Sequence, residues 1–185
     1  MSKCVRCGGS FLTRGRIKLA DADICFKCYD ALGFDHKTGI YIGKSYSWDQ
    51  IKDGYDAMRA RDYQEQAAKE ARSIGLPLKL YRQINRADAT TMEVKILCAI
   101  CAVLQDESRD IDVMDVALGD NGCLMLMIDG VVFIEYKAAD SVKWIRFCNE
   151  GEDKLRIAGA GRMNSLAPRI AAAYDSAAPL HIDVE

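Results

Sequence analysis

The cysteines are the residues whose types and spacing most clearly indicate chemistry. Four of the eight form two Cys-x-x-Cys pairs, Cys4 with Cys7 and Cys25 with Cys28, separated by seventeen residues. Two intervening residues let both sulfurs of a pair turn toward one ion, and the separation suits a four-cysteine zinc site. Because four thiolates surround zinc tetrahedrally, the spacing predicts one structural zinc ion per chain, bound by Cys4, Cys7, Cys25 and Cys28.

The residues around these pairs predict a small module that depends on the metal. Two glycines follow Cys7, where a metal-binding knuckle needs a positive φ. Between the pairs, FLTRGRIKLA predicts a hairpin that turns at Gly15, and YDALGF after Cys28 predicts a short helical turn that ends at Gly33. This order of knuckle, hairpin and helix is the treble-clef arrangement. A unit this small needs a metal ion or another cross-link to stabilise its fold. Because a closed four-cysteine site leaves no open coordination position, we expect the zinc to be structural and not catalytic.

Residues 1–34 resemble the N-terminal treble-clef zinc domain of an uncharacterised family of bacterial and phage proteins. The family carries CxxCG, a short basic hairpin and an "lkDG-x-CxxC" approach to the second pair. Here KLADADIC stands in that place, with Asp21 and Asp23 but without the glycine. The resemblance implies a zinc-stabilised module at the same four cysteines, a phage or prophage origin, and a following domain similar to bacterial pleckstrin-homology folds. It names no activity.

The other four cysteines are predicted to be ordinary core residues. Cys98 and Cys101 also have Cys-x-x-Cys spacing, so a metal or redox pair is the alternative, but they lie in an apolar helical stretch. Cys123 and Cys148 are isolated in strand-like segments. Because free cysteine is among the most buried residue types, we expect all four in the interior without metal.

Two weaker patterns could contact an anion. Arg14 and Arg16 flank Gly15 and could touch a phosphate at the hairpin tip, although the small local charge favours a solvated hairpin. Gly159 to Arg162 precede a predicted helix, so backbone amides and Arg162 could bind an anion there. A plain strand-to-helix turn is the favoured alternative, because isolated glycine motifs are weak signals.

Composition limits the function classes. The net charge of −2 lacks the basic excess of proteins that hold nucleic acid by general electrostatics. No apolar signal region follows Met1, and the longest apolar stretch, 96–104, is too short to cross a bilayer, so we expect a cytoplasmic protein with reduced thiols. His36 and His181 lie in a predicted linker and tail, and no catalytic motif occurs, so we expect no enzyme.

Hydrophobic patterns and turn signals predict an α+β fold. A first helical stretch is expected over 48–74, divided near Gly54 and capped by Ser47 with Gln50. Further helices are expected over 92–105, capped by Thr90 or Thr91, and over 164–177. Residues 78–88 are ambiguous. Five strand-like runs occupy 113–118, 123–128, 131–137, 142–148 and 154–159, separated by Asp, Asn and Gly turns. We expect an antiparallel sheet with helices on one face.

These elements predict four regions: a zinc module at 1–34, a linker and helical connector at 35–89, an α+β domain at 90–178 and a tail at 179–185. The favoured function is a zinc-stabilised adaptor that binds another protein, and a phage origin would favour an inhibitor of a host protein. The alternatives are a nucleic-acid-binding regulator that uses the zinc hairpin and an enzyme with an unrecognised site in the C-terminal domain.

Overall fold

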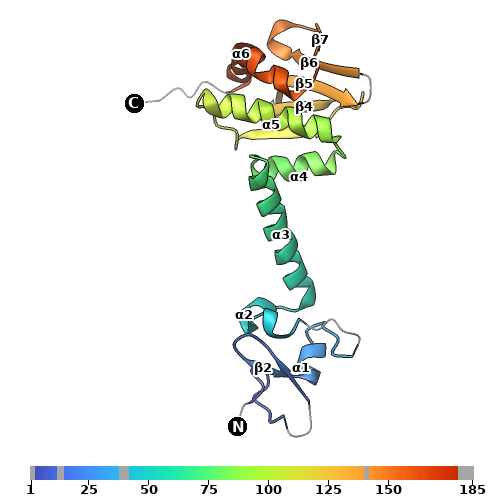
Figure 1. Ribbon diagram of the computed structural model, residues 1–185, viewed down its shortest axis with the longest axis vertical. Helices are drawn as coiled ribbons and strands as arrows, with labels where there is room; N and C mark the ends of the chain where they lie inside the picture. Colours follow the sequence, from blue (N-terminus) through green and yellow to red (C-terminus); the bar gives the residue numbers. More distant parts are fainter. Residues whose placement is uncertain (1–2, 12–14, 38–41, 140–141, 179–185) are drawn as a thin grey trace. The chain divides into compact units, whose positions relative to one another are not determined.

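The computed structural model divides the chain into two compact units, 1–66 and 67–185, each with its own hydrophobic core. The described residues are 3–11, 15–37, 42–139 and 142–178, shown as ribbon in Figure 1. The boundary falls inside helix α3 (Tyr55–Ser73). Residues 35–89, predicted as a connector, are therefore shared between the two units. The predicted tail lies outside the described residues.

The first unit is built on a short antiparallel hairpin of β1 (Arg16–Lys18) and β2 (Asp23–Cys25), followed by α1 (Phe26–Asp30). The Leu19 N–H donates to the Ala22 carbonyl at 2.8 Å and closes the turn. The predicted turn at Gly15 is therefore wrong, because Gly15 precedes β1. The remaining elements of this unit are η1 (Gly43–Ser45), α2 (Trp48–Ile51) and the first part of α3.

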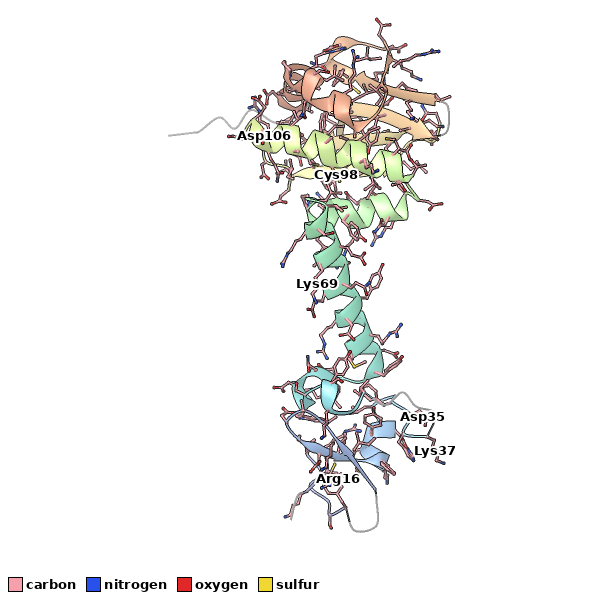
Figure 2. All side chains as sticks on the ribbon, viewed as in Figure 1. Arg16, Asp35, Lys37, Lys69, Cys98 and Asp106 are labelled. Carbon is pink, nitrogen blue, oxygen red and sulfur yellow. The ribbon has the colours of Figure 1, made fainter. Side chains whose placement is uncertain are left out.

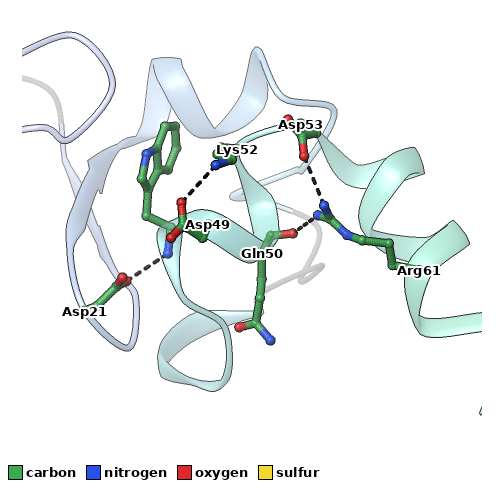
Figure 3. A network of polar contacts seen from close by, with 7 residues as sticks. Asp21, Asp49, Gln50, Lys52, Asp53 and Arg61 are labelled. Atoms are coloured by element: carbon green, nitrogen blue, oxygen red, sulfur yellow. Dashed lines mark hydrogen bonds and ion pairs between the residues drawn. The ribbon is translucent and has the colours of Figure 1, made fainter. Parts of the chain in front are cut away.

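The segment after the hairpin is bonded to it rather than loosely attached. The Trp48 N–H, in the first turn of α2, donates to Asp21 Oδ1 of the hairpin turn at 2.8 Å. The Tyr55 N–H at the start of α3 donates to the Leu32 carbonyl at 2.8 Å. Figure 3 shows the Asp21 contact beside two ion pairs of the same segment, Lys52 with Asp49 and Arg61 with Asp53. The predicted Ser47–Gln50 capping box is confirmed.

The second unit confirms the predicted α+β class. Its strands form one antiparallel sheet in sequence order: β3 (Met114–Leu118), β4 (Leu124–Ile128), β5 (Val131–Ala139), β6 (Val142–Phe147) and β7 (Leu155–Arg156). Its helices are α4 (Leu78–Arg86), α5 (Thr91–Asp106) and α6 (Ala167–Ala177), with 3-10 turns η2 (Cys148–Glu150) and η3 (Ala160–Leu166). The last strand and last helix are shorter than predicted.

One face of this sheet is buried and the other is not. Helices α5 and α6 both pack against β5 and cover the core. Strand residues enter this core in near alternation, interrupted in β5 where the adjacent Phe133 and Ile134 are both buried. In β4 these are Leu124, Leu126 and Ile128, whereas Met125 and Met127 on the opposite pleat stay partly exposed. β3 is an edge strand, so its outward N–H groups have no neighbouring strand to pair with. The Val116 N–H instead donates to Gln83 Oε1 of α4 at 2.9 Å.

None of the helices in the described part of the chain has the length and apolar character that crossing a membrane requires.

Candidate metal centre

The structure brings the four predicted ligands to one point. The Sγ atoms of Cys4, Cys7, Cys25 and Cys28 all lie within 4.8 Å of one another, and those of Cys7 and Cys25 are 4.0 Å apart. Sulfurs arranged tetrahedrally at about 2.3 Å from an ion are separated by about 3.8 Å. A disulfide would need about 2.05 Å. The four free cysteines can therefore hold a metal ion.

The first pair sits in a tight backbone knuckle. The Gly8 N–H donates to the Cys4 carbonyl at 2.8 Å, and the Cys4 N–H donates to the Gly9 carbonyl at 2.9 Å. Gly8 adopts a φ of +67°, which a residue without a Cβ reaches at little cost. This turn aims both Cys4 and Cys7 at the second pair.

Strand and helix position the second pair. Cys25 is the last residue of β2, and Cys28 lies within α1, so a single change of backbone direction presents both thiols to one side. The Arg6 guanidinium donates to the Cys28 carbonyl at 3.0 Å and links the knuckle to α1. Cys4, Cys25 and Cys28 are buried, whereas Cys7 is exposed and marks the open side of the site.

The thiols differ in how readily they ionise. Burial acts to raise the pKa of Cys4, but N–H groups of Cys25, Cys7 and Arg6 outweigh it and bring the pKa to about 6. The Cys25 N–H lies 3.4 Å from the Cys4 sulfur. Burial and then the neighbouring sulfurs raise the pKa of Cys28 to about 12. Because ligand cysteines bind as thiolates, a cation entering the site must displace protons from it.

A pair of glycine variants tests how this module is packed. Gly8 and Gly15 have similar positive φ values, +67° and +59°, but a Cβ on Gly15 would lie 2.3 Å from the Phe26 ring, whereas one on Gly8 meets nothing within 4 Å. We expect Gly8→Ala to cost about 1 kcal/mol of stability from backbone strain and Gly15→Ala about 1–3 kcal/mol more from the clash. Thermal unfolding of the metal-loaded protein measures the stability of both variants. Equal losses of stability in Gly8→Ala and Gly15→Ala would contradict the close packing of Phe26 against Gly15.

The predicted anion contacts are not gathered into one site. Arg16, labelled in Figure 2, forms an ion pair with Asp23 at 3.6 Å and lies near the Phe11 ring. Arg14 lies outside the described residues. Arg162 is exposed in η3, which separates it from the start of α6. Its nearby amides therefore do not form the N-terminus of that α-helix.

The remaining cysteines lie in the second unit. Cys101 and Cys123 are buried as predicted, and burial raises the pKa of Cys101 to about 12. Cys98, labelled on α5 in Figure 2, and Cys148 are partly exposed, so placing them in the interior was wrong. Within the described ranges, no metal-ligand cluster includes any of these four.

A second group of metal-ligand side chains was missed from the sequence. Ligand atoms of Asp30, Asp35 and His36 lie within 4.8 Å of one another. His36 Nδ1 is 2.8 Å from both Asp30 carboxylate oxygens, and its ring stacks on Phe26 with centroids 4.4 Å apart. These contacts close the loop after α1, which is a sufficient role for them. No spacing rule signals a contact between a helix end and the following loop.

Comparison with protein-family models, with curated proteins and with solved structures finds no match to this chain. Its function is therefore inferred from its own residues: a four-cysteine centre that can hold a metal ion, and a separate α+β unit with one exposed sheet face.

Proposed function

We propose that the ion is zinc and that the chain is a zinc-stabilised adaptor that binds another protein. The chemistry of the donor set supports zinc, because four clustered thiols and no carboxylate select soft or borderline tetrahedral ions. Four protein ligands fill a tetrahedral shell, so the role proposed for the ion is to hold the first unit together. The recognition surface is proposed for the second unit.

The exposed side of the sheet carries this proposal. We define the outer sheet face by the partly exposed side chains of Met125, Met127 and Val132, which lie on the pleat opposite the core. Methionine side chains are flexible and polarisable, and protein interfaces are enriched in them. An apolar patch at the centre of a sheet is suited to cover the apolar surface of a partner.

The charges around the patch favour a protein as the partner. Arg146 pairs with Glu135 at 2.6 Å, and Lys79 pairs with Asp115 at 2.9 Å. The members of each pair neutralise one another, so these four residues add little net charge beside the patch. A partner with an apolar, weakly charged surface complements this central patch. Blocking such a partner would make the adaptor an inhibitor, as a phage origin favours.

A double substitution on the outer sheet face tests the proposal. Met125→Lys with Met127→Lys places two charges in the centre of the patch, and we expect the affinity for the partner to fall about 100-fold or more. The partner is identified by capture from the native cell, purified, and titrated against each variant by calorimetry. Tyr63→Lys with Ile74→Lys is the matched control, because both residues are exposed apolar side chains that belong to no strand of the sheet.

Three results would overturn the proposal. The purified partner could bind the Met125–Met127 variant as tightly as the original chain. Capture could require intact nucleic acid, which nuclease treatment reveals. Light scattering could show that the outer sheet face joins two copies of this chain and that the double substitution merely separates them.

A further inference from the structure

A cleft of about 600 Å³ opens at the end of the sheet where β6 and β7 are paired. Its walls combine three cationic side chains, Lys143, Lys154 and Arg156, with the ring of Trp144. Val142 and Ile157 add apolar surface, and none of the lining residues is a carboxylate. A volume of this size is in the range of small-molecule sites.

Strand register places Arg156 against the tryptophan. Trp144 on β6 is directly opposite Arg156 on β7 and opposite Lys137 on β5, so all three belong to one row across the sheet. The Lys154 ammonium lies 4.2 Å from the centroid of the Trp144 ring. Trp144 is only 8% exposed, so it forms a rigid wall rather than a mobile side chain.

Among the described residues, no carboxylate neutralises these cations. In the described part of the chain, Lys143, Lys154 and Arg156 take part in no ion pair, whereas Arg146 and Arg169 on neighbouring elements are both paired with glutamates. The chain as a whole has a net charge of −2, so this positive cluster is a local feature. Glu152 and Asp153 precede Lys154 in the loop but do not line the cleft. Three unneutralised cations beside an apolar wall attract an anion that also carries an apolar group.

We propose that this cleft binds a nucleoside phosphate, either a free nucleotide or a nucleotide within a single strand. Arg156 supplies a planar fork that pairs with two phosphate oxygens, and Lys143 and Lys154 add the charge that a dianionic group needs. The base and sugar lie against the exposed side chain of Val142, which shares the pleat of Trp144. One carboxylate, with half the charge of a phosphate, would leave the cluster poorly neutralised. This inference does not rest on the adaptor proposal, because the cleft and the outer sheet face use different side chains.

Binding is measured on the zinc-loaded full chain by following the indole N–H signal of Trp144 in NMR spectra, with a Trp48→Phe variant to assign it. The probes are inorganic phosphate, ATP, an oligothymidylate and an oligoglutamate peptide. We expect the indole signal to shift as an anion draws the Lys154 ammonium away from the ring. Lys154→Gln with Arg156→Gln should weaken binding about tenfold or more for each lost cation. Lys95→Gln, an exposed cation on α5, is the matched control and should bind normally.

The probes separate the sources of the ligand. Saturable binding of ATP supports a free nucleotide, and binding of the oligothymidylate alone supports a strand. No shift with either, or tighter binding of the oligoglutamate, would overturn the proposal. Equal losses of binding affinity in the Lys95 variant and the double variant would also overturn the proposal, because affinity would then follow the overall charge of the protein. Circular dichroism confirms that each variant is folded. If the double variant does not fold, Lys154→Arg with Arg156→Lys keeps the charge and should retain binding of phosphate.

Discussion

Removing the proposed zinc ion with a chelator should unfold residues 1–66 and leave the folded part of the second unit, through residue 178, intact. The first unit has short elements, with three-residue strands in its hairpin and five residues in α1. Three of the four ligand cysteines belong to its core. Structural zinc supplies on the order of 10 kcal/mol of folding free energy, more than such a core provides alone.

The unfolding should extend beyond the predicted module at 1–34. Ile51 and Met58, from α2 and α3, are buried in the same core as the ligands. Asp21 in the hairpin turn accepts the Trp48 N–H, so loss of the hairpin also removes the bond that holds the first turn of α2. No described residue of the second unit belongs to the cysteine cluster, and this unit has a full apolar core of its own.

Hydrogen exchange measures this effect segment by segment. After chelation, amides of β1, β2, α1 and α2 should exchange rapidly, while those of α5 and of β3 to β6 keep their protection. Cys25→Ser should reproduce the chelated pattern and should bind little zinc in elemental analysis. Cys98→Ser, at a partly exposed cysteine outside the cluster, is the control and should retain both the amide protection of the first unit and the bound zinc. Loss of protection across the whole chain would show one cooperative unit, and undiminished metal in Cys25→Ser would exclude the four-cysteine site.

The patterns that sequence reasoning identified correctly are local ones. Cys-x-x-Cys spacing identified the four cysteines that lie together and can hold a metal ion, because two intervening residues are enough to turn both sulfurs of a pair the same way. The Asp129–Gly130 turn and the alternation in β4 are likewise readable from a few neighbours, and Asp129 and Gly130 both have positive φ. Of the two predicted caps of α5, Thr90 or Thr91, the structure uses Thr90, whose partner Glu93 lies three residues away.

The features that were missed depend on contacts between distant residues. Gly15 was interpreted as a turn, but its backbone is constrained by the ring of Phe26, which lies against it. The ambiguous stretch 78–88 forms α4 because Leu80 and Ile84 enter the core of the second unit. The cationic cleft could not be predicted, because the pairing of Trp144 with Arg156 is a property of the register between β6 and β7.

Glu93 is the buried charged residue whose loss should most weaken the second unit. It is 5% exposed and sits in the first turn of α5. Its carboxylate accepts the Thr90 N–H at 2.9 Å and the Thr90 hydroxyl at 3.0 Å, which completes the helix cap. The other carboxylate oxygen accepts the Ala138 N–H near the end of β5 at 3.0 Å. One side chain thus joins the helix to the sheet.

Glu93→Ala should lower the free energy of unfolding of the second unit by about 2–4 kcal/mol, because the Thr90 and Ala138 N–H groups would be left without their acceptor in a partly or fully buried place. Glu93→Gln keeps one carbonyl oxygen as an acceptor and should lower this free energy of unfolding by about half as much. Glu107→Ala, an exposed residue at the other end of α5, is the control and should change stability by less than about 0.5 kcal/mol. Urea unfolding followed by Trp144 fluorescence in a Trp48→Phe background reports on this unit alone. A loss in Glu93→Ala no larger than that in Glu107→Ala would show that the carboxylate does not hold α5 to β5.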